Sequence, residues 1–154
     1  MLKYHNFDIV FAEFPDETTL AINLTGCPNR CAGCHSPHLQ GDGGEPLDEA
    51  ALQQLLDRYG GAITCVGLMG GDASPEEVAR AAEWVKKGWP QLRVGWYSGR
   101  TAWPPHPERF DYIKLGPWIA AQGPLTSPTT NQRLYRIRPD GTAEEITTRF
   151  MRRS

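Results

Sequence analysis

Three cysteines lie within eight residues of one another, at Cys27, Cys31 and Cys34. Their spacing, Cys-x3-Cys-x2-Cys, can present three thiolates to one metal centre and leaves a fourth coordination position open. A site that the protein closes with four ligands holds a fold together, whereas a site one ligand short can bind and activate a small molecule. The cluster of cysteines therefore predicts metal or redox chemistry rather than a disulfide framework.

Spacing alone leaves two alternatives for the metal. A cubane iron–sulfur cluster takes four ligands, so three thiolates would leave one iron exposed. Zinc would instead be closed tetrahedrally by the three thiolates and either His35 or His38. The second ligand pair that structural zinc sites usually bring is not visible in the sequence, which favours the cluster. The fourth cysteine, Cys65, lies inside an apolar run, and we expect it to be a small core residue.

A second candidate feature is the triplet Gly70, Gly71 and Asp72, which directly follows the apolar run 63–69. Two residues without side chains and an acid could offer backbone carbonyls and a carboxylate to the ammonium group of a ligand. A Gly-Gly turn ahead of a helix can also be a matter of backbone geometry alone. Asp72 could likewise cap that helix, so both interpretations remain open from the sequence.

The elements that must position these residues alternate between strand and helix patterns. Strands are expected at 4–14, 18–24, 63–69, 92–97, 112–115 and 134–138. A weak further segment runs through Ile146. Helices are expected over 47–59 and from an amino-terminal cap at Ser74, with Pro75 in the first turn, to near Gly88.

This alternation implies right-handed crossovers and a mostly parallel sheet, whose strand ends gather along one rim. The cysteine segment, the Gly-Gly-Asp triplet and the turns at 98–100 and 116–118 each follow an expected strand, so they should share that rim. Ser98 and Arg100 are rim candidates for a ligand's ribose or carboxylate, with a solvated loop as the alternative. Because a complete eight-stranded barrel takes about 250 residues, we expect an α/β fold with one domain over 1–154, a partial (β/α) barrel of about five or six mostly parallel strands, open on one side.

Composition and charge argue against several classes of function. The 16 Lys and Arg residues against 18 Asp and Glu residues give a formal charge of -2, which argues against a nucleic-acid footprint or an anionic membrane surface. We expect no secretory leader and no membrane span, since the chain has neither an apolar leader core nor a run of about 18 apolar residues. The expected protein is soluble and cytoplasmic.

Cys-x3-Cys-x2-Cys after a first strand, combined with Gly-Gly-Asp after a second, resembles the radical S-adenosylmethionine (radical SAM) superfamily. The short chain, Gly33 before the third cysteine, the segment 96–99 and the Thr-Asn-Gln-Arg segment 130–133 are similar to one branch, the activating proteins of anaerobic ribonucleoside-triphosphate reductase. The resemblance runs from about residue 4 to residue 150, over nearly the whole chain. Many superfamily members carry an aromatic residue at the position of Gly33, and relatives often carry Tyr at the position of His35.

This resemblance implies that Cys27, Cys31 and Cys34 hold a [4Fe-4S] cluster whose fourth iron binds the amino and carboxylate groups of SAM. It implies a reduced flavodoxin or ferredoxin as electron donor, and reductive cleavage of SAM to a 5′-deoxyadenosyl radical. That radical would then generate a glycyl radical on the large subunit of anaerobic ribonucleoside-triphosphate reductase. No catalytic side chain beyond the cluster ligands is implied.

The resemblance also implies two groups of cofactor-binding residues. They are Gly33, Cys34 and His35, beneath the adenosyl part of SAM, and Gly70, Gly71 and Asp72, beside its methionine end. For His35, a surface position at the exit of the loop is an equal alternative.

An activase must also reach a glycine within a partner protein. We expect the polar connection 116–131, with Trp118, Gln122 and Asn131, to face that partner, and the segment 103–105 could serve in the same way. Activation of another glycyl-radical enzyme, or radical SAM chemistry on another substrate, is an alternative within the same class. A zinc-stabilised interaction module without catalysis is an alternative of a different class.

Overall fold

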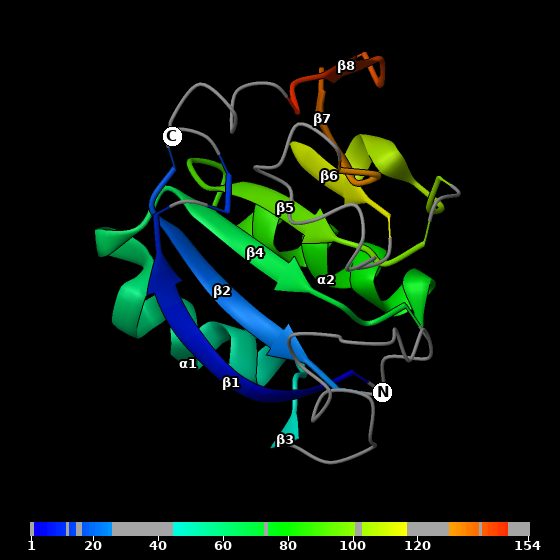
Figure 1. Ribbon diagram of the computed structural model, residues 1–154. Helices are drawn as coiled ribbons and strands as arrows, with labels where there is room; N and C mark the ends of the chain where they lie inside the picture. Colours follow the sequence, from blue (N-terminus) through cyan, green and yellow to red (C-terminus); the bar gives the residue numbers. More distant parts are fainter. Residues whose placement is uncertain are drawn as a thin grey trace.

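The computed structural model describes residues 2–11, 13–14, 17–25, 45–72, 74–100, 103–116, 130–138 and 140–147. Over these residues the chain forms eight strands and two α-helices (Figure 1). The strands are β1 (Lys3–Val10), β2 (Thr19–Leu24), β3 (Glu45–Pro46), β4 (Cys65–Met69), β5 (Arg93–Tyr97), β6 (Tyr112–Leu115), β7 (Arg133–Ile137) and β8 (Ala143–Glu145). The helices are α1 (Glu49–Tyr59) and α2 (Pro75–Gly88), with short 3-10 turns η2 (Gly60–Ala62) and η3 (Pro107–Arg109).

All eight strands belong to one sheet, in the order β3-β1-β2-β4-β5-β6-β7-β8. The four central strands, β2, β4, β5 and β6, run parallel to one another. The outer pairings, β3 with β1, β1 with β2, β6 with β7 and β7 with β8, are antiparallel. The structure thus has an α/β architecture, in which parallel strands occupy the centre and antiparallel strands flank them.

The expectation of five or six mostly parallel strands is met only in part, because three pairings in the described part of the chain are parallel and four are antiparallel. The physical reason lies in the connections. A parallel pair needs a crossover of a dozen or more residues, usually through a helix, whereas an antiparallel pair can be joined by a short turn. Only short connections separate β1 from β2 and β7 from β8, so each of these strands turns back beside its predecessor.

The two helices begin and end where the sequence predicts, within a few residues. Asp48 is the N-cap of α1, and its carboxylate accepts a hydrogen bond from the backbone N of Ala51 at 2.9 Å. Ser74 holds the N-cap position of α2 as expected, with Pro75 in the first turn, and its side chain makes no capping bond. No helix in the described ranges is long and apolar enough to cross a membrane.

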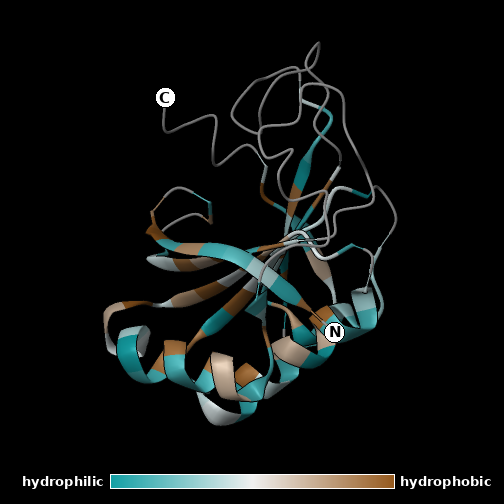
Figure 2. Cartoon of the chain, turned by 90° about the horizontal axis from the view of Figure 1, so that it is seen from below, coloured by the Kyte–Doolittle hydropathy of each residue, from teal (hydrophilic) through white to brown (hydrophobic). Residues whose placement is uncertain are grey.

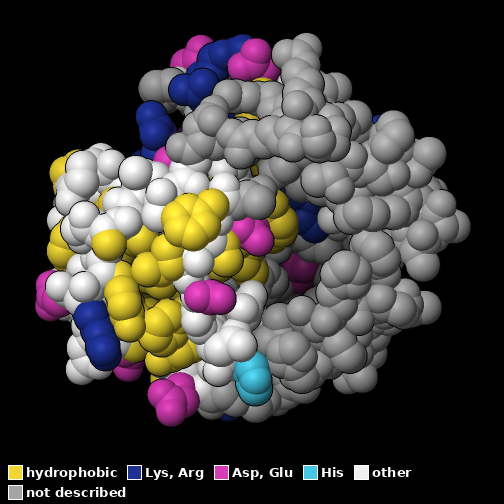
Figure 3. Space-filling view, turned by 60° about the vertical axis from the view of Figure 1, so that its left-hand side comes forward, with side chains coloured by type: hydrophobic (Ala, Val, Ile, Leu, Met, Phe, Trp, Pro, Cys, Tyr) yellow, Lys and Arg dark blue, Asp and Glu magenta, His cyan; other side chains and the backbone are white. Residues whose placement is uncertain are grey.

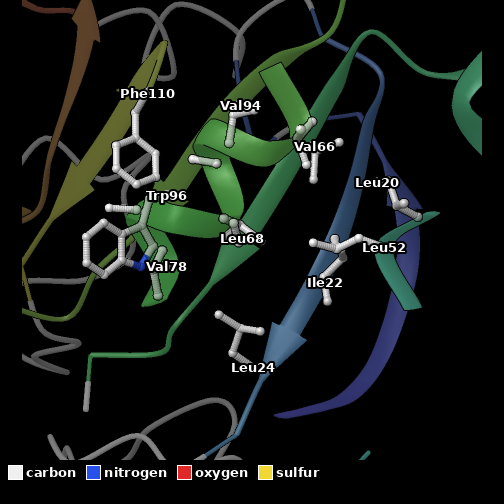
Figure 4. Close-up of a cluster of buried hydrophobic side chains, with 14 of the residues drawn as sticks. Leu20, Ile22, Leu24, Leu52, Val66, Leu68, Val78, Val94, Trp96 and Phe110 are labelled. Atoms are coloured by element: carbon white, nitrogen blue, oxygen red, sulfur yellow. The ribbon is translucent and has the colours of Figure 1, made fainter. Parts of the chain in front are cut away.

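Both helices pack on one face of the sheet, as seen in Figures 1 and 2. Successive residues of a strand point to opposite faces, so every second residue of the central strands meets the helices. Figure 4 shows this layer, in which the side chains of β2, β4, β5 and α2 are fully or almost fully buried. Its members include Leu20, Ile22, Leu24, Val66, Leu68, Val78, Val94 and Trp96.

The opposite face carries small residues at three neighbouring positions. Ala21, Gly67 and Gly95 lie side by side across β2, β4 and β5, and small residues at all three positions leave room above the sheet. The ring of Phe14, from the connection between β1 and β2, is fully buried there. A Cβ on Gly95 would lie 2.5 Å from Cε1 of that ring, so the close approach of Phe14 requires glycine at this position. A Cβ on Gly67 would meet Met69 and Thr19 at 2.8 and 2.9 Å, and Phe14 at 3.2 Å.

Candidate functional site

The carboxyl ends of the parallel strands bring the expected rim residues together. Gly70 follows β4, and its backbone N donates to the carbonyl of Tyr97 at 2.9 Å. Ser98 follows β5, and its backbone N donates to the carbonyl of Lys114 in β6 at 2.8 Å. Gly116 follows β6, and its backbone N donates to the carbonyl of Arg100 at 2.8 Å. The expected common rim is confirmed for the turns after these three strands.

Asp72 is the buried centre of this rim. Its side chain is 1% exposed, and its carboxylate accepts a hydrogen bond from Ser98 Oγ at 2.6 Å and another from the backbone N of Gly99 at 2.9 Å. Ser98 Oγ in turn accepts from the backbone N of Arg100 at 3.1 Å. The carboxylate therefore joins the turn after β4 to the turn after β5.

The sequence left two alternatives for Ser98, a ligand contact or a solvated loop residue, and the structure contradicts the second. It is 2% exposed, and its hydroxyl is engaged both as donor to Asp72 and as acceptor from Arg100. Arg100 is exposed at the rim. The contact of either residue with a ribose or carboxylate stays a prediction.

Gly70 and Gly71 have the backbone conformation that favours glycine, with φ of 95° and 81°. A Cβ on Gly71 would lie 2.7 Å from Cδ1 of Leu24 and 2.8 Å from Cγ2 of Val78, so this position must lack a side chain. The geometric reason for the glycine pair is confirmed. Its second expected role, presentation of backbone groups to a ligand, stays a prediction.

The carbonyls of the two glycines already accept hydrogen bonds within the protein. Gly70 O accepts from Nε1 of Trp96 at 2.6 Å, and Gly71 O accepts from the backbone N of Ser74 at 3.0 Å. A carbonyl oxygen has two lone pairs, so each can accept one more bond from a ligand. The present bonds fix the direction in which the carbonyls point.

Lys114 and Tyr97 are two rim residues that the sequence analysis did not single out. Lys114 is 7% exposed; its Nζ donates to Gly116 O at 3.0 Å and lies 5.2 Å from the centre of the Tyr97 ring. The hydroxyl of Tyr97 donates to the backbone carbonyl of Glu13. The available signal was a lysine inside an apolar strand, because buried lysines are rare and are paired when they occur.

A second polar cluster lies at the opposite, amino-terminal edge of the parallel strands. The carboxylate of Glu17, which is 5% exposed, accepts from Thr64 Oγ1 at 2.7 Å, from Tyr112 OH at 2.7 Å and from Arg93 at 3.0 Å. Burial, followed by the hydrogen bond to Glu17, raises the pKa of Tyr112 above its ordinary value. This cluster ties the connection after β1 to the starts of β4, β5 and β6.

Cys65 lies beside this cluster and is fully buried. Burial raises the pKa of its thiol well above the usual value, and the negative charge of Glu17 adds to the effect. A thiol held protonated is a poor metal ligand. The expectation that Cys65 is a core residue is confirmed.

The expected metal ligands Cys27, Cys31 and Cys34, and the neighbouring Gly33 and His35, lie outside the described residues. His38, Trp118 and Gln122 also lie outside them. In the parts of the chain that the structure does describe, no group of three or more His, Cys, Asp or Glu side chains could hold a metal ion.

Figure 3 shows apolar side chains gathered over part of the face that it presents. On β1 and α1, Phe7, Ile9 and Tyr59 are partly buried against the core. The large apolar side chains with the greatest exposure among the described residues are Phe11, at 68%, and Trp103, at 48%. Trp103 packs on Tyr135, with ring centres 4.9 Å apart. Single exposed apolar residues are common in proteins and do not by themselves indicate a partner.

Comparison with known proteins finds no relative of this chain. No family model matches the chain, and neither the curated proteins nor the solved structures contain a match. The assignment of a function therefore depends on the residues and their arrangement.

Proposed function

We propose that this chain is a radical SAM activase that binds an iron–sulfur cluster and SAM, and generates a glycyl radical on the large subunit of anaerobic ribonucleoside-triphosphate reductase. One observation supports the proposal most directly. The turns after β4 and β5 lie together at one edge of the parallel strands, where Ser98 donates a hydrogen bond to Asp72. β2 belongs to the same parallel set and ends at Leu24. The cysteine motif begins three residues later, at Cys27.

The donor set fits the proposed group. Three thiolates with one open position suit a [4Fe-4S] cluster that must bind a further ligand. The full burial of Cys65 supports a ligand set without it. When bound, the cluster would supply one electron for the reductive cleavage of SAM. Cys27, Cys31 and Cys34 would hold it, and the protein's own part is to bind SAM, orient it and exclude water.

The residues proposed to bind SAM divide between two turns. Gly70 and Gly71 would offer backbone carbonyls whose direction is fixed by Trp96 and Ser74. Gly33, Cys34 and His35 would lie beneath the adenosyl part. The proposed architecture is a single radical SAM core domain over 1–154, in which β2, β4, β5 and β6 form the parallel part of a shortened barrel that is open on one side.

The first test is anaerobic reconstitution with iron and sulfide. A brown protein with cluster absorption, which releases 5′-deoxyadenosine and methionine from SAM under reduction by flavodoxin or dithionite, supports the proposal. A colourless protein that retains one tightly bound zinc ion and leaves SAM intact contradicts it and favours the interaction module.

The second test identifies the partner. The reduced, SAM-loaded protein is mixed with the large subunit of an anaerobic ribonucleoside-triphosphate reductase, and the glycyl radical is sought as a doublet by electron paramagnetic resonance. No doublet with this reductase, together with continued cleavage of SAM, would favour another glycyl-radical enzyme or another substrate. The connection 116–131 and the segment 103–105 remain the proposed partner-facing surfaces.

A further inference from the structure

The hydrogen bonds of Asp72 lie within the protein, and its carboxylate is not open to a ligand. A carboxylate that pairs with an ammonium group keeps an oxygen accessible to it. Asp72 is 1% exposed, and each of its oxygens accepts a short hydrogen bond from the turn after β5, at 2.6 and 2.9 Å. The donors are Ser98, itself 2% exposed, and the backbone of Gly99.

These bonds belong to a wider connection between the two turns. The backbone N of Gly70 donates to Tyr97 O, and the indole of Trp96 donates to Gly70 O at 2.6 Å. Gly70 and Gly71 are thus held in their positive-φ conformation by contacts that lie on either side of them. Because glycine is the most flexible residue, their carbonyl directions depend on such external contacts.

We propose that Asp72 is a positioning residue, which fastens the turn after β4 to Ser98 and Gly99 and thereby orients the Gly70 and Gly71 carbonyls, and that it does not pair with the ammonium group of SAM. The inference rests on the proposed function, because it concerns how that site binds SAM. Ser98 then has the same positioning role, because its hydroxyl donates a hydrogen bond to Asp72. Loss of either residue should release the same pair of turns.

Two substitutions of Asp72 separate positioning from charge pairing. In Asp72→Asn the amide oxygen can accept from Gly99 and the amide nitrogen can donate to Ser98 Oγ, so the connection persists without its negative charge. In Asp72→Ala both donors lose their acceptor. Positioning therefore predicts a mild effect for Asn and a large one for Ala, whereas an ion pair with the ligand predicts a large effect for both.

The experiment measures SAM affinity by titration calorimetry on the anaerobically reconstituted protein, with the unfolding free energy of each variant measured alongside. We expect Ser98→Ala and Asp72→Ala each to weaken SAM binding about tenfold or more. The double variant should bind no more weakly than Asp72→Ala, because both changes remove one connection. Asp72→Asn should stay within about threefold of the unchanged protein, and Ser98→Thr, which keeps the hydroxyl, should restore most of the affinity lost in Ser98→Ala.

Glu76→Gln serves as the matched control, since Glu76 is an acid in the first turn of α2 whose side chain is 62% exposed, and SAM affinity should not change. A loss of about a hundredfold in Asp72→Asn, as expected for a broken charge pair, would overturn the inference, as would strictly additive effects of Asp72→Ala and Ser98→Ala. If Asp72→Ala does not fold, the contrast between Asp72→Asn and Ser98→Ala still decides. Failure of the unchanged reconstituted protein to bind SAM would instead overturn the proposed function itself.

Discussion

At the scale of single residues, the two carboxylates Glu17 and Asp72 have comparable surroundings at opposite edges of the sheet. Each is almost fully buried and each accepts from donors on neighbouring elements. A buried carboxylate without donors would be strongly unfavourable, so these hydrogen bonds are a condition of the fold. Both carboxylates therefore connect neighbouring parallel strands at their ends.

Glu17→Ala should lower the free energy of unfolding by about 2–3 kcal/mol, because the buried hydroxyl of Tyr112 loses its acceptor. Arg93 adds little to this loss, since its side chain is 51% exposed. Urea denaturation measures the change. Glu145→Ala is the control: its ion pair with Arg133 is about half exposed, and the expected loss is about 0.5 kcal/mol or less. Equal effects of the two substitutions would contradict the structural role of Glu17.

The four cysteines should behave as two classes. Replacing any one of Cys27, Cys31 or Cys34 by Ala should abolish retention of the cluster and cleavage of SAM, because three thiolates are the proposed minimum. Cys65→Ala should keep both and cost only packing, on the order of 1 kcal/mol. Iron and sulfide analysis after reconstitution, with SAM cleavage, measures the difference. Loss of the cluster in Cys65→Ala as well would mean that the ligand set is wrong.

At the scale of elements, the connection between β1 and β2 does more than reverse the chain. Phe14 packs over Gly67 and Gly95. Its ring packs edge-on against Tyr97 and stacks on Tyr112, with ring centres 5.1 and 5.2 Å away. This side chain supplies the apolar layer that the strands themselves lack at this level. The face opposite the helices is therefore closed in part by a side chain from outside the sheet.

Phe14→Ala should destabilise the protein by about 3–5 kcal/mol, through lost burial and the cavity left above the glycines. Phe11→Ala, three residues earlier in the chain, should change stability by no more than about 0.5 kcal/mol, because Phe11 is 68% exposed. Thermal unfolding of the two variants provides the comparison. A loss in Phe11→Ala as large as in Phe14→Ala would show that the two residues have been given the wrong roles.

At the scale of the whole molecule, the sheet has a parallel centre between antiparallel margins, and these parts should differ in local stability. β4 and β5 are hydrogen-bonded on both sides, and β5 carries the largest fully buried side chain, Trp96. β3 and β8 are short edge strands with exposed residues. Amide hydrogens of β4 and β5 should exchange slowest, and those of β3 and β8 fastest. Hydrogen exchange followed by mass spectrometry tests this order. Rapid exchange in β4 or β5 would contradict the central position of the parallel strands.

The sequence predicts those parts of this fold that depend on local pattern. Alternating apolar residues locate the strands Thr19–Leu24 and Tyr112–Leu115 almost to the residue. The expected cap at Ser74 locates the start of α2. β3 has two residues and no pattern to detect. Strand direction is not set by local pattern alone: β6 and β7 are antiparallel although residues 116–132 lie between them. The antiparallel margins were therefore not predicted.

The candidate site divides in the same way. The gathering of the turns at one edge follows from parallel strands and could be predicted. The contact of Asp72 with Ser98 could not, because it joins residues 26 positions apart and depends on how the two turns fold. Lys114 differs, since the alternation of the strand predicts that it lies on the face of Tyr112 and not toward the helices with Ile113.

The fixed position of Phe14 limits which insertions and deletions the connection between β1 and β2 can accept. Hairpin connections usually tolerate inserted or deleted residues at small cost. Here the carbonyl of Glu13 is held by Tyr97 and the carboxylate of Glu17 by partners on three other elements, so Phe14 is fixed from both sides. Adding or removing one residue between these anchors would move the ring out of register with the glycine pair. The length of this connection is therefore as tightly constrained as the register of the strands beneath it.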